Sequence, residues 1–363
     1  MTGTLIEVRR ESLRDFLGAR LYASEADRDL ASLLLAVAAA ARSIAGVVAR
    51  GALAEAGGGA GAVNVHGEVQ KPLDLIANEI FLRACERDGV VAGMVSEELD
   101  EPYAIPERYP RGRYLLAFDP LDGSSNIDVD VTVGSIFSVL RHAGDEPPCA
   151  DDFLQAGNRQ VAAGYALYGP ATMLVLSIGE GVHGFTLDAG SAEFVLTHPA
   201  MRIDPDAGEF AINASNARFW QPAVKRYVAD CQAGRDGHFG RDFNMRWIAS
   251  LVAEVHRILM RGGVYLYPRD EKLPARAGRL RLLYEANPMA MLVEQAGGRA
   301  STGREQLQQL LPDAIHQRIP LILGARNDVE RIERYHRESD DGSDRPFASP
   351  LFHENSLFLP EAR

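Results

Sequence analysis

An acidic turn that follows an apolar run limits the possible folds of this chain more than any other segment. The turn reads Phe118-Asp119-Pro120-Leu121-Asp122-Gly123-Ser124-Ser125-Asn126-Ile127-Asp128, and the apolar run before it is 114–118. The run predicts a buried strand, and carboxylates at a strand end suit a hard cation. Gly123, Ser124 and Ser125 then offer backbone N–H groups to an anion. The segment therefore predicts both halves of a metal-assisted phosphoryl site.

Other acidic groups decide between this interpretation and a plain surface turn. Asp-Pro-Leu-Asp-Gly alone would suit a turn, because proline and glycine favour turn positions. Glu97-Glu98 and Glu285, however, also follow predicted strands. Strand ends face the crevices in which α/β proteins keep their sites. Together with Asp119 and Asp122, these groups predict a cage for several Mg²⁺ ions, which take oxygen ligands.

Composition indicates a large globular chain of the α/β class. The 363 residues are 46% hydrophobic, enough for a large core and two domains. The net charge of −12, from 38 basic and 50 acidic residues, argues against a nucleic-acid surface. Three scattered cysteines are too few for a disulfide framework or a zinc site. They predict a reduced, cytoplasmic setting.

Two apolar segments could be mistaken for membrane spans. Residues 30–41 are too short and read as a buried helix. Residues 161–179 carry no charge, but Gly164, Gly169 and Pro170 interrupt them, so they predict two buried strands. Residues 1–20 contain several charged side chains and no apolar core of a secretory signal. We therefore expect no membrane partner.

Periodicity and turn residues divide the chain into two α/β subdomains and a tail. The boundary is expected at 203–205, which gives domains 1–203 and 204–340 and a tail 341–363. Predicted helices cover 10–55, 74–86, 242–261 and 288–295, and predicted strands cover 90–95, 114–119, 129–141, 210–213, 264–267, 280–284 and 321–325. A glycine-rich stretch at 56–66 could be an inert linker or an active-site lid, and its place before Glu68 and Asp74 favours the lid. Residues 142–158 are expected to be a polar loop.

Four segments together resemble one enzyme family. They are 118–128, Gly67 to Asp74, Val95 to Glu98, and Leu280 to Ala290, in the family's order and spacing. The chain resembles class I fructose-1,6-bisphosphatases of the bacterial type, over about residues 25–335. Asp-Pro-Leu-Asp-Gly alone would be shared with inositol-phosphatase relatives. The resemblance implies a layered αβαβα sandwich and Mg²⁺-dependent hydrolysis of the 1-phosphate of fructose 1,6-bisphosphate.

The resemblance also implies a role for each matching residue. Asp74 and Glu98 would form the dyad that takes the proton from the attacking water, since neighbouring carboxylates raise each other's proton affinity. Two or three Mg²⁺ ions, with Mn²⁺ as an alternative, would be held by Glu68, Glu97, Asp119, the Leu121 carbonyl, Asp122 and Glu285. Substrate would be bound by Asp122, Gly123, Ser124, Ser125, Asn213, Arg246, Tyr265, Leu266, Tyr267 and Arg279.

Arg246 has an independent argument, and two positions depart from the family pattern. A helix that began at Asp242 would place Arg246 in its first turn, where a cation opposes the dipole. A phosphate ligand explains that misfit. Trp247 stands where animal members carry a phosphate-binding tyrosine. Arg279 stands where the family usually has a lysine. The exchange keeps the positive charge but replaces a compact ammonium group with a planar guanidinium that can donate two parallel hydrogen bonds.

The resemblance implies a homo-oligomer, expected to be a tetramer, because family members place the arginine equivalent to Arg246 across a subunit interface. It leaves sedoheptulose 1,7-bisphosphate, or both sugars, as an alternative substrate. A catalytically silent binding protein on the same fold is the alternative from another class. The pathway, gluconeogenesis or photosynthetic carbon fixation, stays open.

The resemblance further implies an AMP site at a helix start, and here the matching stretch is 23–28. Glu25 and Asp27 place two carboxylates in the first turn, where they would repel a phosphate. Arg113, Tyr114 and Arg141 match the rest of that pocket. We expect weak or absent inhibition by AMP.

Overall fold

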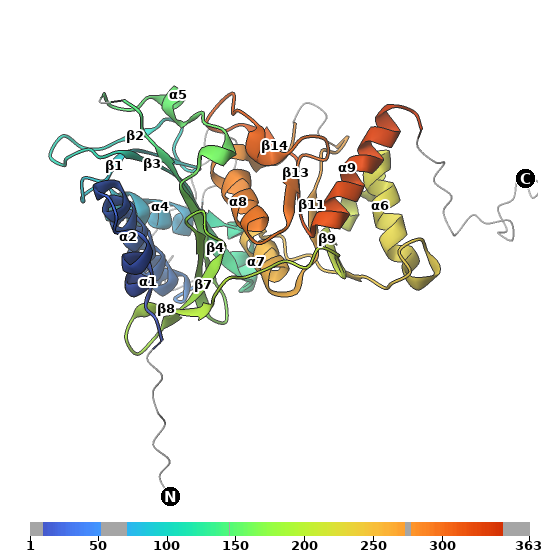
Figure 1. The fold of residues 1–363 in the computed structure, drawn as a ribbon, viewed down its shortest axis with the longest axis horizontal. Helices are drawn as coiled ribbons and strands as arrows, with labels where there is room; N and C mark the ends of the chain where they lie inside the picture. The colour runs from blue at the N-terminus through green and yellow to red at the C-terminus, as the bar shows by residue number, and fades with distance from the viewer. Residues whose placement is uncertain (1–9, 52–70, 145, 273–276, 344–363) are drawn as a thin grey trace, which may run out of the picture.

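The chain forms five alternating layers of helix and sheet. A computed structural model describes residues 10–51, 71–144, 146–272 and 277–343. Figure 1 shows an outer helical layer, a large sheet, a central helical layer, a smaller sheet and a second outer helical layer from left to right. The expected αβαβα architecture is therefore confirmed.

The first layer contains α1, α2 and α4. Their bounds are α1 Leu13–Arg20, α2 Glu25–Val48 and α4 Pro72–Cys85. The single helix expected over 10–55 is wrong in the region of 21–24, where the chain breaks between α1 and α2. Ser24 causes the new start, because its side chain accepts the Asp27 N–H while the Asp27 carboxylate accepts the Ser24 N–H.

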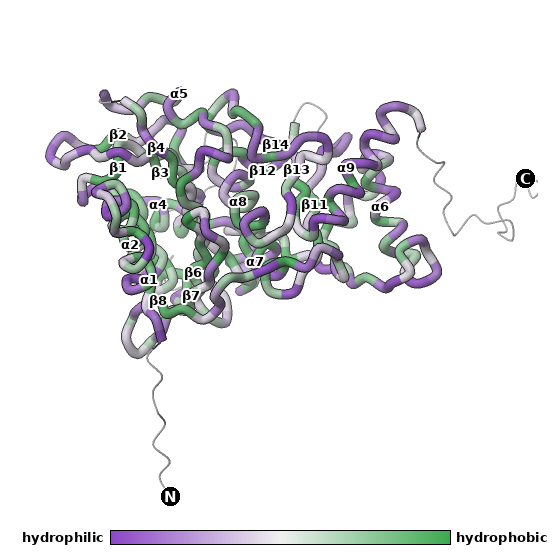
Figure 2. Tube along the Cα trace, viewed as in Figure 1, coloured by the Kyte–Doolittle hydropathy of each residue, from purple (hydrophilic) through white to green (hydrophobic). Residues whose placement is uncertain are grey.

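Helix α2 is apolar because it packs on the protein's own core. In the described part of the chain it is the single helix that is long and apolar enough to cross a membrane. Its Leu33, Leu34, Val37 and Ile44 are buried in the cluster that also contains Phe118 and Phe137 of the large sheet. Figure 2 shows hydrophobic residues along that sheet and on the helices beside it. Core packing therefore accounts for the composition of α2.

The large sheet has eight strands in the order β2-β1-β3-β4-β5-β6-β7-β8. Its strands are β1 Val91–Ser96, β2 Tyr103–Ala104, β3 Tyr114–Asp122, β4 Val133–Arg141, β5 Ala162–Tyr168, β6 Thr172–Ser177, β7 His183–Asp188 and β8 Glu193–His198. The two buried strands expected within 161–179 are confirmed as β5 and β6. The strand expected from 129 begins only at Val133, because Ser124–Val129 is a 3₁₀ helix.

The rest of the chain builds the other three layers. The central helices are α7 Leu251–Arg261 and α8 Asn287–Gln295, and the outer ones are α6 Pro222–Ala233 and α9 Arg326–Asp340. The smaller sheet, in the order β10-β9-β11-β15-β13, contains β10 Asn244–Met245, β9 Glu209–Ile212, β11 Val264–Tyr267, β15 Leu321–Gly324 and β13 Arg299–Ser301. The strands β12 Leu280–Arg281 and β14 Arg318–Ile319 pair separately, and α5 Ala150–Phe153 lies in the expected polar loop.

Two sequence predictions in this half are wrong at their boundaries. The helix expected from Asp242 begins at Leu251, because Ser250 caps α7 by accepting the Ala253 N–H. The strand expected over 280–284 ends at Arg281. A π-helical turn, Leu282–Ala286, follows it and carries Glu285.

Candidate active site

Three buried carboxylates converge at the end of β3. Asp119, Asp122 and Glu285 each offer an oxygen, and these oxygens lie within 4.8 Å of one another. Residues three apart in a regular strand point to opposite faces of the sheet. The pairing of β3 with β4 is irregular between Asp119 and Asp122, so both carboxylates can reach one site. The π-helical turn brings Glu285 to them from the other half of the chain.

The buried negative charges of this centre favour the binding of a cation. Burial raises the pKa of Asp119 well above its usual range, and the charges of Glu97, Asp122 and Glu285 add to the effect. Burial also raises the pKa of Asp122 to about 6 and, with repulsion from Glu97, that of Glu285 to about 8. Buried like charges are costly unless a counter-charge is present. An all-oxygen donor set of this kind fits Mg²⁺ or a similar hard cation.

Hydrogen bonds fix the direction of all three carboxylates. Asp119 Oδ1 accepts the Leu121 N–H at 2.9 Å, which places the Leu121 backbone inside the turn. Asp122 Oδ2 accepts the Ser250 hydroxyl and the Val252 N–H, both at 2.8 Å. Glu285 Oε2 accepts the Arg281 N–H at 2.6 Å. Each carboxylate is therefore oriented by at least one backbone N–H.

Glu97 reaches the same centre but is held by a buried cation. It follows β1, and its N–H donates to the Phe118 carbonyl at 3.2 Å. Arg281 Nη1 lies 2.6 Å from Glu97 Oε1 and 4.0 Å from Glu285 Oε2. Sequence reasoning missed Arg281. The available signal was a charged side chain inside the apolar run 280–284.

Asp74 lies within electrostatic reach of Glu97, and Glu98 directly follows Glu97 in the chain. Asp74 lies in the first turn of α4, and its Oδ2 accepts the Lys71 N–H at 3.0 Å. Burial is the main cause that raises the pKa of Asp74 to about 6, and the Glu97 charge also raises it, while Ser124 lowers it. Glu98 lies in the turn after β1 and is half-buried, and its N–H donates to Ser96 Oγ at 3.2 Å.

The turn after Asp122 requires a glycine. Gly123 has φ of 74°, and a Cβ there would lie 2.7 Å from Ser250 Cβ. Ser124 and Ser125 begin the 3₁₀ helix that follows. Ser124 is half-buried and Ser125 is exposed. The turn therefore lies between the acidic centre and solvent, on the side of α7.

An aromatic cluster lies on one face of β11. Tyr265 and Tyr267 alternate with Leu266, whose side chain is buried on the opposite face among residues of α6 and α9. Trp247 stacks on Tyr265 with ring centroids 6.0 Å apart and meets Tyr267 edge-on at 5.9 Å. The guanidinium of Arg279 lies 5.7 Å from the Tyr267 ring centroid. These side chains form a polar and aromatic wall.

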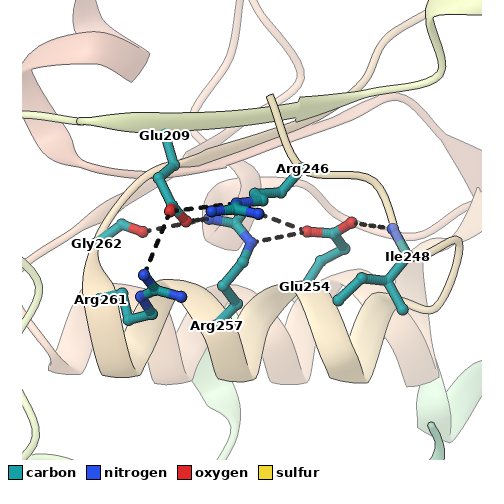
Figure 3. A network of polar contacts seen from close by, with 7 residues as sticks. All are labelled: Glu209, Arg246, Ile248, Glu254, Arg257, Arg261 and Gly262. Atoms are coloured by element: carbon teal, nitrogen blue, oxygen red, sulfur yellow. Dashed lines mark hydrogen bonds and ion pairs between the residues drawn. The ribbon is translucent and has the colours of Figure 1, made fainter. Parts of the chain in front are cut away.

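Asn213 and Arg246 come from the two neighbouring strands of the smaller sheet. Asn213 follows β9, and its Oδ1 accepts the Ser215 N–H at 3.1 Å and the Ser215 hydroxyl at 2.6 Å. Arg246 follows β10 and lies outside any helix, so the prediction that it occupies a helix first turn is wrong. Its Nε lies 3.4 Å from Glu209 Oε1, and its side chain is 48% exposed (Figure 3). Glu209, rather than a helix dipole, governs its position.

Two sequence expectations fall on 52–70, outside the described residues. They are the predicted metal ligand Glu68 and the predicted lid at 56–66.

Several known proteins are similar to this chain in both sequence and fold. The family sequence models described as "Fructose-1-6-bisphosphatase, N-terminal domain" and "Fructose-1-6-bisphosphatase, C-terminal domain" match residues 14–199 and 203–337. The class 1 fructose-1,6-bisphosphatase of Hydrogenophilus thermoluteolus is 60% identical over 93% of this chain and 94% of its own length. That of Methylacidiphilum infernorum is 54% identical over 96% and 98%. The crystal structure of Leishmania major fructose-1,6-bisphosphatase in holo form matches 90% of this chain and 99% of its own with a TM-score of 0.83 and 35% identity.

Proposed function

The chain belongs to the fructose-1,6-bisphosphatase family, and from this membership we propose that its acidic centre hydrolyses the 1-phosphate of fructose 1,6-bisphosphate. The products are fructose 6-phosphate and inorganic phosphate. The observation that carries the proposal is the convergence of Asp119, Asp122 and Glu285 beside the glycine-serine turn. This arrangement brings cation ligands and anion-binding backbone into one site.

Mg²⁺ is the proposed metal, with two or three ions per site and Mn²⁺ as an alternative. Asp119, Asp122, Glu285, Glu97 and the Leu121 carbonyl would hold these ions, and Glu68 is the further proposed ligand. When bound, the metal supplies Lewis-acid stabilisation of the charge on the phosphoryl group. The raised pKa values of Asp122 and Glu285 support this assignment, because a bound cation offsets the cost of burying these charges and their repulsion by Glu97.

Asp74 and Glu98 are the proposed proton acceptors for the attacking water. Asp74 has the stronger physical support, since its pKa of about 6 lets it accept a proton and release it near neutral pH. Glu98 lies in the turn after β1, beside the metal ligand Glu97. Such a dyad would take the proton of the attacking water away from the phosphoryl group, towards the first turn of α4.

The two phosphates of the substrate are proposed to bind at opposite ends of the site. Asp122, Gly123, Ser124 and Ser125 form the end for the 1-phosphate. The end for the sugar and the 6-phosphate is formed by Asn213, Arg246, Tyr265, Leu266, Tyr267 and Arg279. Leu266 can contribute through its backbone, because its side chain is buried on the other face of β11.

The proposed assembly is a homotetramer in which Arg246 completes the site of a neighbouring subunit. The 48% exposure of its side chain supports a role at an interface. The two sheets are the proposed cores of domains 1–203 and 204–340. A cytoplasmic location is proposed, in keeping with the free thiols of Cys85, Cys149 and Cys231.

One assay tests the function directly. Phosphate release from fructose 1,6-bisphosphate should require Mg²⁺ and stop when EDTA is added. No release at any Mg²⁺ concentration would favour a binding protein on the same fold. Sedoheptulose 1,7-bisphosphate at equal concentration tests the second candidate substrate, because its additional CHOH group leaves both phosphate ends unchanged.

A further inference from the structure

A buried ion network lies behind the end of the site that carries Arg246. Glu209, Glu254 and Arg257 are 7%, 0% and 9% exposed. Arg257 Nη1 lies 2.8 Å from Glu209 Oε2, and Arg257 Nε and Nη2 lie 3.2 and 3.1 Å from Glu254 Oε2 (Figure 3). The guanidinium therefore bridges β9 and α7 through two carboxylates.

The charge imbalance of this network favours a second cation beside it. Two buried carboxylates face one buried guanidinium, so a net negative charge remains. Arg246 approaches it through Nε, 3.4 Å from Glu209 Oε1. Arg261 approaches the same oxygen at 3.9 Å, but its side chain is 63% exposed. Arg246 thus has a preferred position before any phosphate arrives, because its Nε contacts Glu209.

Glu254 also fixes the backbone that carries Arg246. Glu254 Oε1 accepts the Ile248 N–H at 2.7 Å. The carbonyl of Ile248 accepts Asn126 Nδ2 at 3.0 Å, and Asn126 belongs to the 3₁₀ helix after Gly123. The segment 246–250 is therefore held on one side by the network and on the other by the turn next to the acidic centre.

Little space exists around the network for another arrangement. Gly263 has φ of 117°, and a Cβ there would lie 2.9 Å from both Arg257 Nη1 and the Glu209 carbonyl oxygen. Gly262 offers its carbonyl to Arg257 Nη1 at 3.5 Å. The glycine pair after α7 therefore lets the backbone close over the guanidinium.

We propose that Glu254, supported by Arg257 and Glu209, is a positioning residue that sets Arg246 for the distal phosphate of the substrate. The inference rests on the proposed function and deepens it. Glu209, Glu254 and Arg257 are not among the proposed metal ligands or proton acceptors, so their role is to position Arg246. The consequence is that the network governs substrate affinity, while turnover at saturating Mg²⁺ changes little.

Glu254→Gln is the main test, because glutamine keeps an oxygen for Ile248 N–H and removes the charge that holds Arg257. We expect KM for fructose 1,6-bisphosphate to rise about fivefold to tenfold, with kcat within about twofold, as for lost uniform binding. The inhibition constant of fructose 6-phosphate, which retains the distal phosphate, should rise by the same factor. Arg257→Lys should act in the same direction, because an ammonium cannot bridge both carboxylates.

A double-mutant cycle with Arg246→Ala separates positioning from general destabilisation. If Glu254 acts through Arg246, Glu254→Gln should change KM by less than about twofold in the Arg246→Ala background. Arg261→Gln is the matched control and should leave KM unchanged, since Arg261 lies at 3.9 Å and is exposed. Melting temperatures identify the folded variants, and Arg257→Lys decides the question if Glu254→Gln does not fold.

Three results would overturn the inference. They are additive effects on KM in the double mutant, a loss of kcat with KM unchanged, and an unchanged KM in both folded single variants. In each of these the wild-type enzyme remains an Mg²⁺-dependent bisphosphatase, so the proposed function stands. An inactive wild type would instead overturn the function and this inference together.

Discussion

At the scale of single residues, Asp119 gives the sharpest test of the metal centre. Asp119→Asn removes one charge from the buried cluster and keeps the side-chain volume. We expect Mg²⁺-dependent phosphate release to fall about 100- to 1,000-fold, because metal stabilisation amounts to several kcal/mol. The metal-free variant should melt at the same or a higher temperature than the metal-free wild type, since repulsion with Asp122 and Glu285 is relieved.

The matched control for this experiment is Asp130→Asn. Asp130 is exposed and has φ of 54°, a conformation that asparagine also adopts readily. Its activity should equal that of the wild type. Full activity of Asp119→Asn at ordinary Mg²⁺ concentrations would show that the ligand assignment is wrong.

Glu98 tests the proposed proton acceptor. Glu98→Gln keeps the size of the side chain but cannot accept the proton, so kcat should fall about 10²- to 10⁴-fold with little change in KM. Asp74→Asn should behave in the same way. Steady-state kinetics at saturating Mg²⁺ measures both. Near-normal turnover of Glu98→Gln would remove this residue from the mechanism.

Sequence reasoning found the residues whose chemistry is visible locally. Asp119, Asp122 and Glu285 follow apolar runs, and a carboxylate in that position is informative by itself. Arg281 and Glu254 were missed, because their partners Glu97 and Ile248 become neighbours only through the fold. The charge inside the apolar run 280–284 marks Arg281 as unusual, but the sequence does not show which residue it pairs with.

At the scale of elements, the start of α2 bears on AMP inhibition. Arg113 lies 3.0 Å from Glu25 Oε2 and 2.9 Å from Asp29 Oδ2, so two carboxylates already surround this cation of the family's AMP pocket. Tyr114 donates its hydroxyl to the Ala26 carbonyl at 2.7 Å. An incoming phosphate would meet these negative charges, and we expect weak or absent inhibition. Titration of AMP against activity at fixed Mg²⁺ measures it.

A charge-neutral variant extends this test. Replacing Glu25 and Asp29 by their amides should increase the sensitivity to AMP, because it frees Arg113 for a phosphate. These pairs are at the surface, so the wild-type fold should not depend on them. Half-inhibition of the wild type at low micromolar AMP would contradict the prediction.

Helix α9 contains a buried histidine, His336, that we expect to make the fold sensitive to acid. Burial is the main cause that lowers the pKa of His336 to about 4, Arg304 lowers it further, and Asp340 opposes the shift. An unfolded chain binds this proton near pH 6.5. Stability should therefore fall as the pH drops from about 6.5 towards 4, by on the order of 2 kcal/mol for this site.

The variant His336→Gln isolates that contribution. Gly303 lies so close that a Cβ on it would be 2.8 Å from His336 Nε2, so an imidazolium cannot gain space for new partners. We expect the variant to lose less stability than the wild type between pH 7 and 5 in urea unfolding. His256, whose pKa burial also lowers to about 4, should keep part of the slope in both proteins. Parallel curves for the two proteins would contradict the assignment to His336.

The elements predicted from sequence were those with strong periodicity or turn signals. β5 and β6 were found because Gly169 and Pro170 separate two apolar runs. The predicted start of α7 is too early, since 242–250 contains no helical turn and only the Ser250 cap sets the first turn. Residues 282–284 of the π-helical turn are predicted as strand, because a short apolar run fits either structure.

At the scale of the whole molecule, Arg246 tests whether subunits share their sites. Arg246→Ala should raise KM about tenfold with a smaller change in kcat, because binding is lost more than chemistry. If the residue serves a neighbouring subunit, mixing Arg246→Ala with Glu98→Gln subunits should restore part of the activity. Some sites would then combine an intact Glu98 with an Arg246 from the other variant. Mixed oligomers verified by mass that show no recovery would argue against sharing.

Asp122 connects the two halves of the molecule through its hydrogen bonds. It belongs to β3, yet its Oδ2 accepts hydrogen bonds from Ser250 and Val252 at the start of α7. We therefore expect any change in the position of α7 to change the affinity of the Asp122 carboxylate for its cation. If a sugar phosphate orders 246–250 and thereby strengthens metal binding, thermodynamic reciprocity requires the metal to strengthen sugar-phosphate binding by the same factor.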